Sequence, residues 1–154
     1  MTVATDWITA ISTFGAAVGV WYARQQLISS RGLAQLQFED SLAKEYREIA
    51  NRIPTKALLG SDLSDDEYAK AFDDIFHYID LSNEQVYLRI RGRIGNDVWE
   101  NWRDGIKTNL SLPTFRRAWS EIKEKSGSFQ ELRRLEKEEF KLDPCEWDKT
   151  RRDC

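Results

Sequence analysis

The residues of this chain best suited to binding a ligand are basic side chains between residues 89 and 117. They are Arg89, Arg91, Arg93, Arg103, Lys107, Arg116 and Arg117. Expected helix ends and a glycine-containing turn lie among them. Guanidinium groups, backbone N–H groups at a helix start and nearby tryptophan rings could hold a phosphorylated nucleotide, with a ring stacked on the base. The six arginines are therefore candidate ligand-binding residues.

A structural interpretation of the same arginines competes with this one. Acidic residues lie close by in the sequence, and each could pair with an arginine on the surface: Glu84, Asp97, Glu100 and Asp104. The tryptophans are then core residues and not platforms for a base.

Motifs of catalysis are missing from the sequence. It contains no glycine-rich phosphate loop, nucleophile elbow, paired cysteine motif or HExxH. The acid pairs Asp65-Asp66 and Asp73-Asp74 are adjacent residues, which point in different directions on a helix and do not form a carboxylate dyad. His77 is the single histidine and is interpreted as structural. We expect no enzymatic activity, no cofactor and no metal.

The elements that position these residues are predicted to be helices, because apolar residues recur at spacings of three and four. A capping box at Ser64 and Glu67 starts one helix. Ser82 or Asn83 is expected to restart the chain after a helix break over 80–83. Val86 to Ile94 is the nearest candidate for a strand, but its glycines weaken it.

Residues that typically start or end helices divide the rest of this region. Gly92 and Gly95 end one element, and Asn96 or Asp97 caps the next. Pro113 suits the first turn of a further helix, and residues 126–128 break it. A last amphipathic helix ends at Asp143-Pro144. We expect an all-α domain of about four short helices over residues 56–142, followed by a charged, flexible tail over 143–154.

The N-terminal stretch from Trp7 to Ile28 is predicted to be a single transmembrane helix, assigned to residues 1–28. Seventeen residues from Trp7 to Ala23 carry no formal charge, and they would span roughly 25 Å as a helix. Aromatic residues mark both ends. Asp6 precedes the stretch and Arg24 and Arg31 follow it, which favours an outside N-terminus and a cytoplasmic C-terminus at the inner membrane.

Two other interpretations compete for this stretch. A cleaved signal peptide needs a basic start, and residues 1–6 contain no lysine or arginine. A buried helix of a soluble domain stays open, because hydroxyl residues such as Thr9, Ser12 and Thr13 make the stretch only moderately hydrophobic.

The stretch has two different faces. One is bulky: Trp7, Ile11, Phe14, Val18 and Trp21. The other carries small and hydroxyl residues: Thr5, Thr9, Ser12, Ala16, Gly19 and Ala23, with Gly15 and Gly19 forming GxxxG. Small stripes allow close helix packing in membranes, so we predict self-association. The face could serve packing alone or could line a narrow polar path.

Residues 29–55 are expected to form a helical stalk. One continuous helix from about Thr5 to Ile53 is possible, with Gly32 the preferred place for a bend. The whole chain has 154 residues, with 26 acids against 23 bases and a net charge of −3. That balance argues against a general nucleic-acid binder.

The segment from Asp80 to Trp119 resembles a bacterial family of small proteins with one N-terminal hydrophobic helix, a helical stalk and a compact helical domain. The matching features are the arginine-glycine turn, the tryptophan pair Trp99 and Trp102, and the run of Pro113, Phe115 and Trp119. The layout is also similar to small membrane effectors of bacterial anti-phage systems. The resemblance implies an architecture and no functional residues.

The leading hypothesis is a homo-oligomeric, single-span membrane protein that acts as a channel-like or membrane-disrupting effector. Its expected partners are the lipid bilayer, further copies of itself, and a nucleotide ligand or protein that controls the helical domain. The alternative is a membrane-tethered adaptor whose helical domain docks a protein partner.

Overall fold

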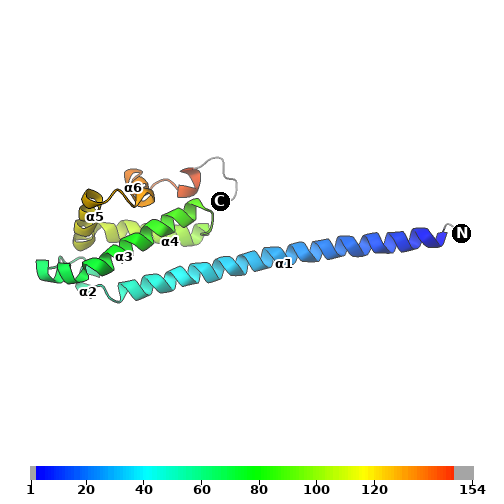
Figure 1. The fold of residues 1–154 in the computed structure, drawn as a ribbon, viewed down its shortest axis with the longest axis horizontal. Helices are drawn as coiled ribbons and strands as arrows, with labels where there is room; N and C mark the ends of the chain where they lie inside the picture. The colour runs from blue at the N-terminus through cyan, green and yellow to red at the C-terminus, as the bar shows by residue number, and fades with distance from the viewer. Residues whose placement is uncertain (1–2, 148–154) are drawn as a thin grey trace. The chain divides into compact units, whose positions relative to one another are not determined.

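The computed structural model describes residues 3–147, with side chains described from residue 20 onward. This part of the chain is all helical and contains no strand (Figure 1). The helices are α1 (Val3–Ala50), α2 (Thr55–Leu58), α3 (Asp65–Ile90), α4 (Asn96–Ser111), α5 (Pro113–Lys125), α6 (Gln130–Lys137) and the short 3₁₀ helix η1 (Pro144–Trp147). The prediction of an all-α fold is confirmed.

The chain divides into two units, Met1–Phe38 and Glu39–Cys154. We call the second the helical unit. It includes the last turns of α1, where Leu42 and Ile49 are buried, and it includes η1, where Pro144 is buried. The folded part therefore extends beyond the expected 56–142 on both sides, because residues 39–55 and 143–147 contribute to its core.

The first unit contains only α1, which continues through Gly32 without the expected bend. A Cβ atom added at Gly32 would meet no other atom within 4 Å, so this glycine serves no close contact. Within the described residues, no helix reaches the length and the hydropathy that a membrane span requires. The predicted span over 1–28 stays a prediction.

Helix α3 is the centre of the helical unit, and it contacts α4, α5, α6 and η1 (Figure 1). Its start agrees with the sequence: the backbone N–H of Ser64 donates to the Glu67 carboxylate over 3.1 Å, as a capping box requires. Ile75, Ile79 and Val86 are completely buried along it. Burying a side chain of this size stabilises the fold by roughly 1.5–3 kcal/mol.

The expected helix break over 80–83 was wrong, because α3 continues from Asp65 to Ile90. The hydroxyl of Ser82 donates to the Tyr78 carbonyl one turn earlier, over 2.8 Å, and so stays within the helix. The Asn83 side chain accepts a hydrogen bond of 3.0 Å from the backbone N–H of Leu132. Asn83 therefore caps the first turn of α6 and not a helix of its own. The strand considered over Val86–Ile94 is also helix up to Ile90.

The remaining helix boundaries lie close to those predicted from the sequence. Gly95, one residue before the expected caps, is the N-cap of α4, and Pro113 begins α5. Trp99 of α4 and Phe115 and Trp119 of α5 are buried in the core, where Phe115 packs on Tyr78 of α3 and Trp119 packs on Phe129. The N-terminus of α4 has no cap from its own side chains. The Glu39 carboxylate of α1 accepts the Gly95 N–H over 2.8 Å instead, and its negative charge suits the positive end of the helix.

Candidate functional site

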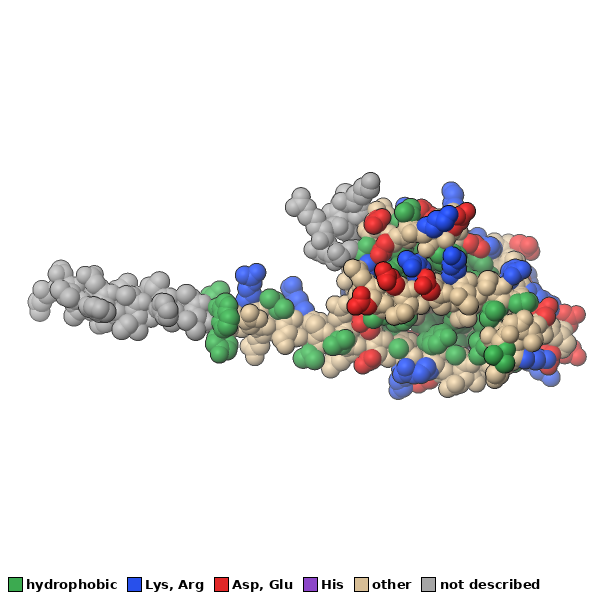
Figure 2. Space-filling model, turned by 180° about the vertical axis from the view of Figure 1, so that it is seen from behind, with side chains coloured by type: hydrophobic (Ala, Val, Ile, Leu, Met, Phe, Trp, Pro, Cys, Tyr) green, Lys and Arg blue, Asp and Glu red, His purple; other side chains and the backbone are tan. Residues whose placement is uncertain are grey.

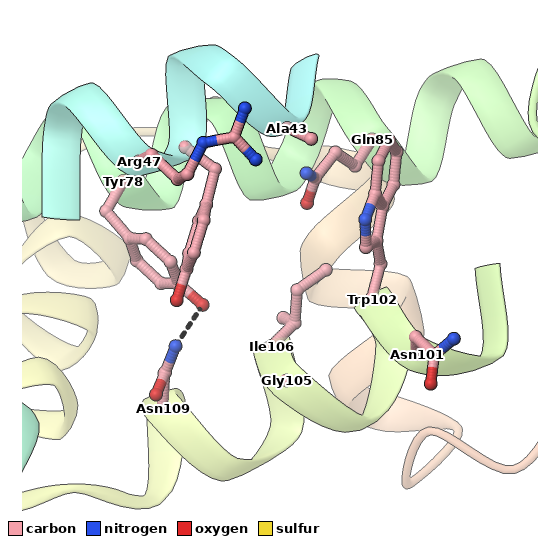
Figure 3. Close-up of a pocket in the computed structure, with 10 residues that line it drawn as sticks. Ala43, Arg47, Tyr78, Gln85, Asn101, Trp102, Gly105, Ile106 and Asn109 are labelled. Carbon is pink, nitrogen blue, oxygen red and sulfur yellow. Dashed lines mark hydrogen bonds between the residues drawn. The ribbon is translucent and has the colours of Figure 1, made fainter. Parts of the chain in front are cut away.

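A pocket of about 300 Å³ opens between the end of α1, α3 and α4 within the helical unit (Figure 3). We call it the Gln85 pocket. Its volume is at the lower end of the range for small-molecule sites. It is lined by Ala43, Tyr46, Arg47, Tyr78, Gln85, Asn101, Trp102, Gly105, Ile106 and Asn109.

Tyr78 closes one end of the pocket with its ring and hydroxyl. The ring packs edge-on against Tyr46 at 6.0 Å and Phe115 at 5.1 Å between centroids. Asn109 Nδ2 donates a hydrogen bond of 2.8 Å to the Tyr78 hydroxyl (Figure 3). Burial raises the pKa of Tyr78 to about 12. Tyr78 is therefore a neutral phenol at physiological pH and fixes the orientation of Asn109.

Gln85 is the buried polar group of the pocket wall. It is only 5% exposed, and its amide points into the pocket (Figure 3). No hydrogen bond to Gln85 is found within the part of the chain that the structure describes. Its amide atoms are not enclosed: they reach the solvent of the pocket, which can satisfy them in the absence of a ligand. The pocket thus presents an amide NH2 group as donor and an amide oxygen as acceptor to a ligand.

Trp102 and Arg47 add an aromatic ring and a positive charge to the same space (Figure 3). Trp102 is half-buried, in contrast to Trp99 and Trp119, which belong to the core. Arg47 is exposed and forms no ion pair with any other described residue. An aromatic face, an amide and a guanidinium group can hold a planar anion by stacking, hydrogen bonding and charge.

Gly105 lines the pocket from the interior of α4. A Cβ atom at this position would meet no atom within 4 Å. A glycine inside a helix costs about 1 kcal/mol relative to alanine, and no neighbouring side chain requires it here. What the glycine provides is open space at the pocket.

The six predicted arginines do not form one site. Arg89 is 4% exposed and lies in a closed cluster, which we call the Arg89 cluster. Its guanidinium donates to both Asp143 carboxylate oxygens, over 2.9 and 2.6 Å, to the Ile94 carbonyl over 2.7 Å and to the Asn96 side chain. This geometry fastens the end of α3 to the start of α4 and to η1 and leaves Arg89 no role at the surface.

Burial and positively charged neighbours have opposite effects on the pKa of Asp143. Burial favours the neutral acid, but the hydrogen bonds from Arg89 and from the Cys145 N–H, with the charges of Arg89 and Arg103, outweigh it and lower the pKa of Asp143. Asp143 is therefore ionised at neutral pH. The sequence predicts this residue at the start of a flexible tail, but its partner Arg89 lies 54 positions earlier in the chain.

The other five arginines are exposed or half-buried, and they lie near both ends of α3. Arg91 donates to the Tyr87 hydroxyl over 3.0 Å, and Arg93 is exposed in the turn that follows α3. Arg103 pairs with Asp104 at 3.1 Å. Asp104 is the one expected acid that pairs with these arginines among the described residues.

Arg116 and Arg117 lie in the first two turns of α5, close to the start of α3. Arg116 donates to the Ser111 carbonyl. Arg117 lies 3.9 Å from the centre of the Tyr68 ring and donates to Asp65 over 2.9 Å. Asp65 and Arg89 are 24 residues apart on α3, which corresponds to about 36 Å. One small ligand cannot contact both ends.

His77 and the acidic pairs lie at or near the surface of the helical unit. His77 is exposed on α3 and borders a shallow acidic groove with Glu45, Glu48 and Glu84. Asp65 pairs with Arg117, and Asp74 pairs with Arg52 at 2.6 Å. Among the described residues, no group of three or more histidine, cysteine or acidic side chains is arranged to hold a metal ion.

The predicted self-association face falls mostly outside the described side chains. Thr5, Thr9, Ser12, Gly15, Ala16 and Gly19 belong to that part, and of the seven only Ala23, which is exposed, is described. Further along α1, seven large apolar side chains are more than half exposed: Val20, Trp21, Tyr22, Leu27, Ile28, Leu33 and Leu36. Apolar and basic side chains lie beside one another on this stretch (Figure 2).

Sequence reasoning did not find the Gln85 pocket, because its polar residues come from three helices. Arg47, Gln85 and Asn109 are separated by long stretches of sequence and share no motif. The one local signal is Gly105, a glycine within the amphipathic pattern of α4.

Comparison of the chain with family models, with curated proteins and with solved structures gives no match.

Proposed function

We propose that this chain is a single-span protein of the bacterial inner membrane that self-associates and acts as a channel-like or membrane-disrupting effector. In this proposal residues 1–28 cross the bilayer, with the N-terminus outside. The helical unit is cytoplasmic and controls the assembly. Such an effector would suit defence against phage infection.

The observation that carries the proposal is that one helix, α1, exposes large apolar side chains in its middle part and lines the Gln85 pocket near its end. Between residues 20 and 36 it exposes seven large apolar side chains to solvent, which is costly unless lipid or another helix covers them. Trp21 and Tyr22, whose rings lie 5.4 Å apart, suit the boundary between lipid and water. The uncharged stretch from Trp7 to Ala23 precedes them.

Near its end, α1 forms part of the Gln85 pocket. Ala43, Tyr46 and Arg47 line it, opposite residues of α3 and α4. A ligand in the pocket would touch α1 directly. If the ligand binds one arrangement of α1 more tightly than another, its differential affinity shifts the population of the two arrangements. The control step of the proposed effector is this shift.

Reconstitution into liposomes tests the proposal. Purified full-length chain should resist extraction by alkaline carbonate and should release a trapped dye or conduct ions. A variant carrying Thr9→Leu and Ser12→Leu should stay in the membrane but lose conductance, because its helix contact face has lost two hydroxyl groups. An Arg93→Gln variant is the matched control and should behave as the unchanged chain.

Complete extraction of the chain by carbonate would contradict the membrane assignment. If the chain stays in the membrane, does not conduct and binds one stoichiometric cytosolic protein, the adaptor hypothesis replaces the effector hypothesis. The Leu variant should then behave as the unchanged chain.

A further inference from the structure

We infer that the Gln85 pocket binds a nucleoside monophosphate, with the base against Trp102 and the Gln85 amide and the phosphate near Arg47. The regulatory meaning of this inference rests on the proposed function, since the pocket would be its control site. The binding itself depends only on the residues of the pocket.

The Gln85 amide selects for a base. Its donor and acceptor point into the pocket from a side chain that is 5% exposed, and no described residue hydrogen-bonds to it (Figure 3). A primary amide can form two parallel hydrogen bonds with a donor and acceptor pair on the edge of a nucleobase, as glutamine does with adenine. A purely aliphatic ligand would displace solvent from this amide and offer it no hydrogen-bond partner.

The aromatic side chains suit a flat ligand. Trp102 is half-buried at the pocket wall, and Tyr46, another residue that lines the pocket, is 37% exposed. Stacking of a base on an aromatic ring contributes to affinity for every base, because every base has a π face. The Tyr78 ring is held by Tyr46 and Phe115, so the end of the pocket is preformed.

The charge and the size of the site select for one phosphate. Arg47 is the pocket's guanidinium, and it has no acidic partner among the described residues. A free guanidinium favours a phosphate by bidentate, charge-assisted hydrogen bonds. The volume of about 300 Å³ suits a mononucleotide, and larger dinucleotides would not fit inside.

Titration of the full-length chain in detergent micelles, followed by tryptophan fluorescence and calorimetry, tests the inference. The probes are AMP, GMP, CMP and UMP, with adenosine, ribose 5-phosphate and inorganic phosphate as partial ligands. At least one monophosphate should bind about tenfold or more tightly than each partial ligand. Equal affinity for ribose 5-phosphate, or no saturable binding of any monophosphate at millimolar concentration, would overturn the inference.

Two variants separate the roles of the side chains. Gln85→Leu should weaken monophosphate binding about tenfold or more. Arg47→Gln should weaken it similarly and leave the affinity for adenosine unchanged. Arg93→Gln, an exposed arginine in the turn after α3, is the matched control and should change nothing. If Arg93→Gln weakens binding and Arg47→Gln does not, the nucleotide lies elsewhere.

A third variant, Gly105→Leu, adds a side chain at the pocket without removing a buried group. It should unfold at the same denaturant concentration or above it, and it should weaken binding about tenfold or more. Unchanged affinity would contradict the location. Nucleotide binding without any effect on liposome conductance would leave the ligand assignment intact and contradict the proposed control of the membrane assembly.

Discussion

Arg89 and Gln85 lie one turn apart on the same side of α3, and both are about 95% buried. Arg89 donates four hydrogen bonds to Asp143, Ile94 and Asn96. Gln85 faces a pocket and has no hydrogen-bond partner among the described residues. A buried polar group that is completely paired holds the fold together, whereas an accessible, unpaired one reduces stability and leaves bonding capacity for a ligand.

The largest effect is expected from Arg89→Met, which should lower the free energy of unfolding by about 3 kcal/mol or more. The substitution leaves the Asp143 carboxylate, the Ile94 carbonyl and the Asn96 side chain without their donor. Urea denaturation followed by circular dichroism measures it. Arg93→Gln is the control and should change stability by less than about 0.5 kcal/mol. A small effect of Arg89→Met on the free energy of unfolding would show that the Arg89 cluster does not hold the fold together.

Acid should weaken the same cluster. Because the pKa of Asp143 is lowered in the folded protein, its contribution is present above the pKa of the unfolded chain and is lost as pH falls through the folded pKa. Stability measured from pH 7 downward should decline below about pH 4. The Asp143→Asn variant should be less stable at pH 7 and should lose less on acidification. If stability falls with pH in parallel for the unchanged chain and for Asp143→Asn, Asp143 is not a source of the loss of stability in acid.

Gln85→Leu should change the free energy of unfolding in the opposite direction from Arg89→Met. Removing a buried amide without partners should raise the free energy of unfolding by about 1 kcal/mol in the absence of ligand. The same variant loses nucleotide affinity, so stability and binding should change in opposite directions. The measurement is urea denaturation with and without a saturating monophosphate. Destabilisation comparable to that of Arg89→Met would show that Gln85 is a structural residue.

The smallest effect is expected from Gly105→Ala. Nothing within 4 Å obstructs a Cβ atom, and alanine is a better helix former than glycine, so stability should rise by roughly 0.5–1 kcal/mol. Thermal unfolding followed by circular dichroism measures this change. A decrease would mean that the open space at Gly105 contributes to the fold itself.

Local signals in the sequence predicted much of the fold. The capping box at Ser64 and Glu67, the start of α5 at Pro113 and the break after Lys125 are properties of neighbouring residues. Each of them caps, starts or ends a helix within a few residues of its own position. Sequence spacing is therefore enough to find them.

The wrong predictions concern residues whose partners are distant. Asn83 has the side chain of a helix cap, but it caps α6 and not its own helix. Arg89 was grouped with its neighbours in sequence, although Asp143 determines its role. The Gln85 pocket depends on the packing of three helices, and no single stretch contains its pattern. Spacing identifies the types of chemistry available but not which side chains meet.

The hydrogen bond from the Gly95 N–H to Glu39 has a consequence for dividing the chain into fragments. A fragment that starts at residue 56 keeps every residue of α3 to α6 but lacks the carboxylate at the beginning of α4, and it lacks Leu42, Ile49 and Ile53 of the core. The shortest fragment expected to fold by itself therefore starts before Glu39. In limited proteolysis, cleavage ahead of residue 38 should leave a resistant product, whereas a cut within 39–53 should be followed by rapid degradation.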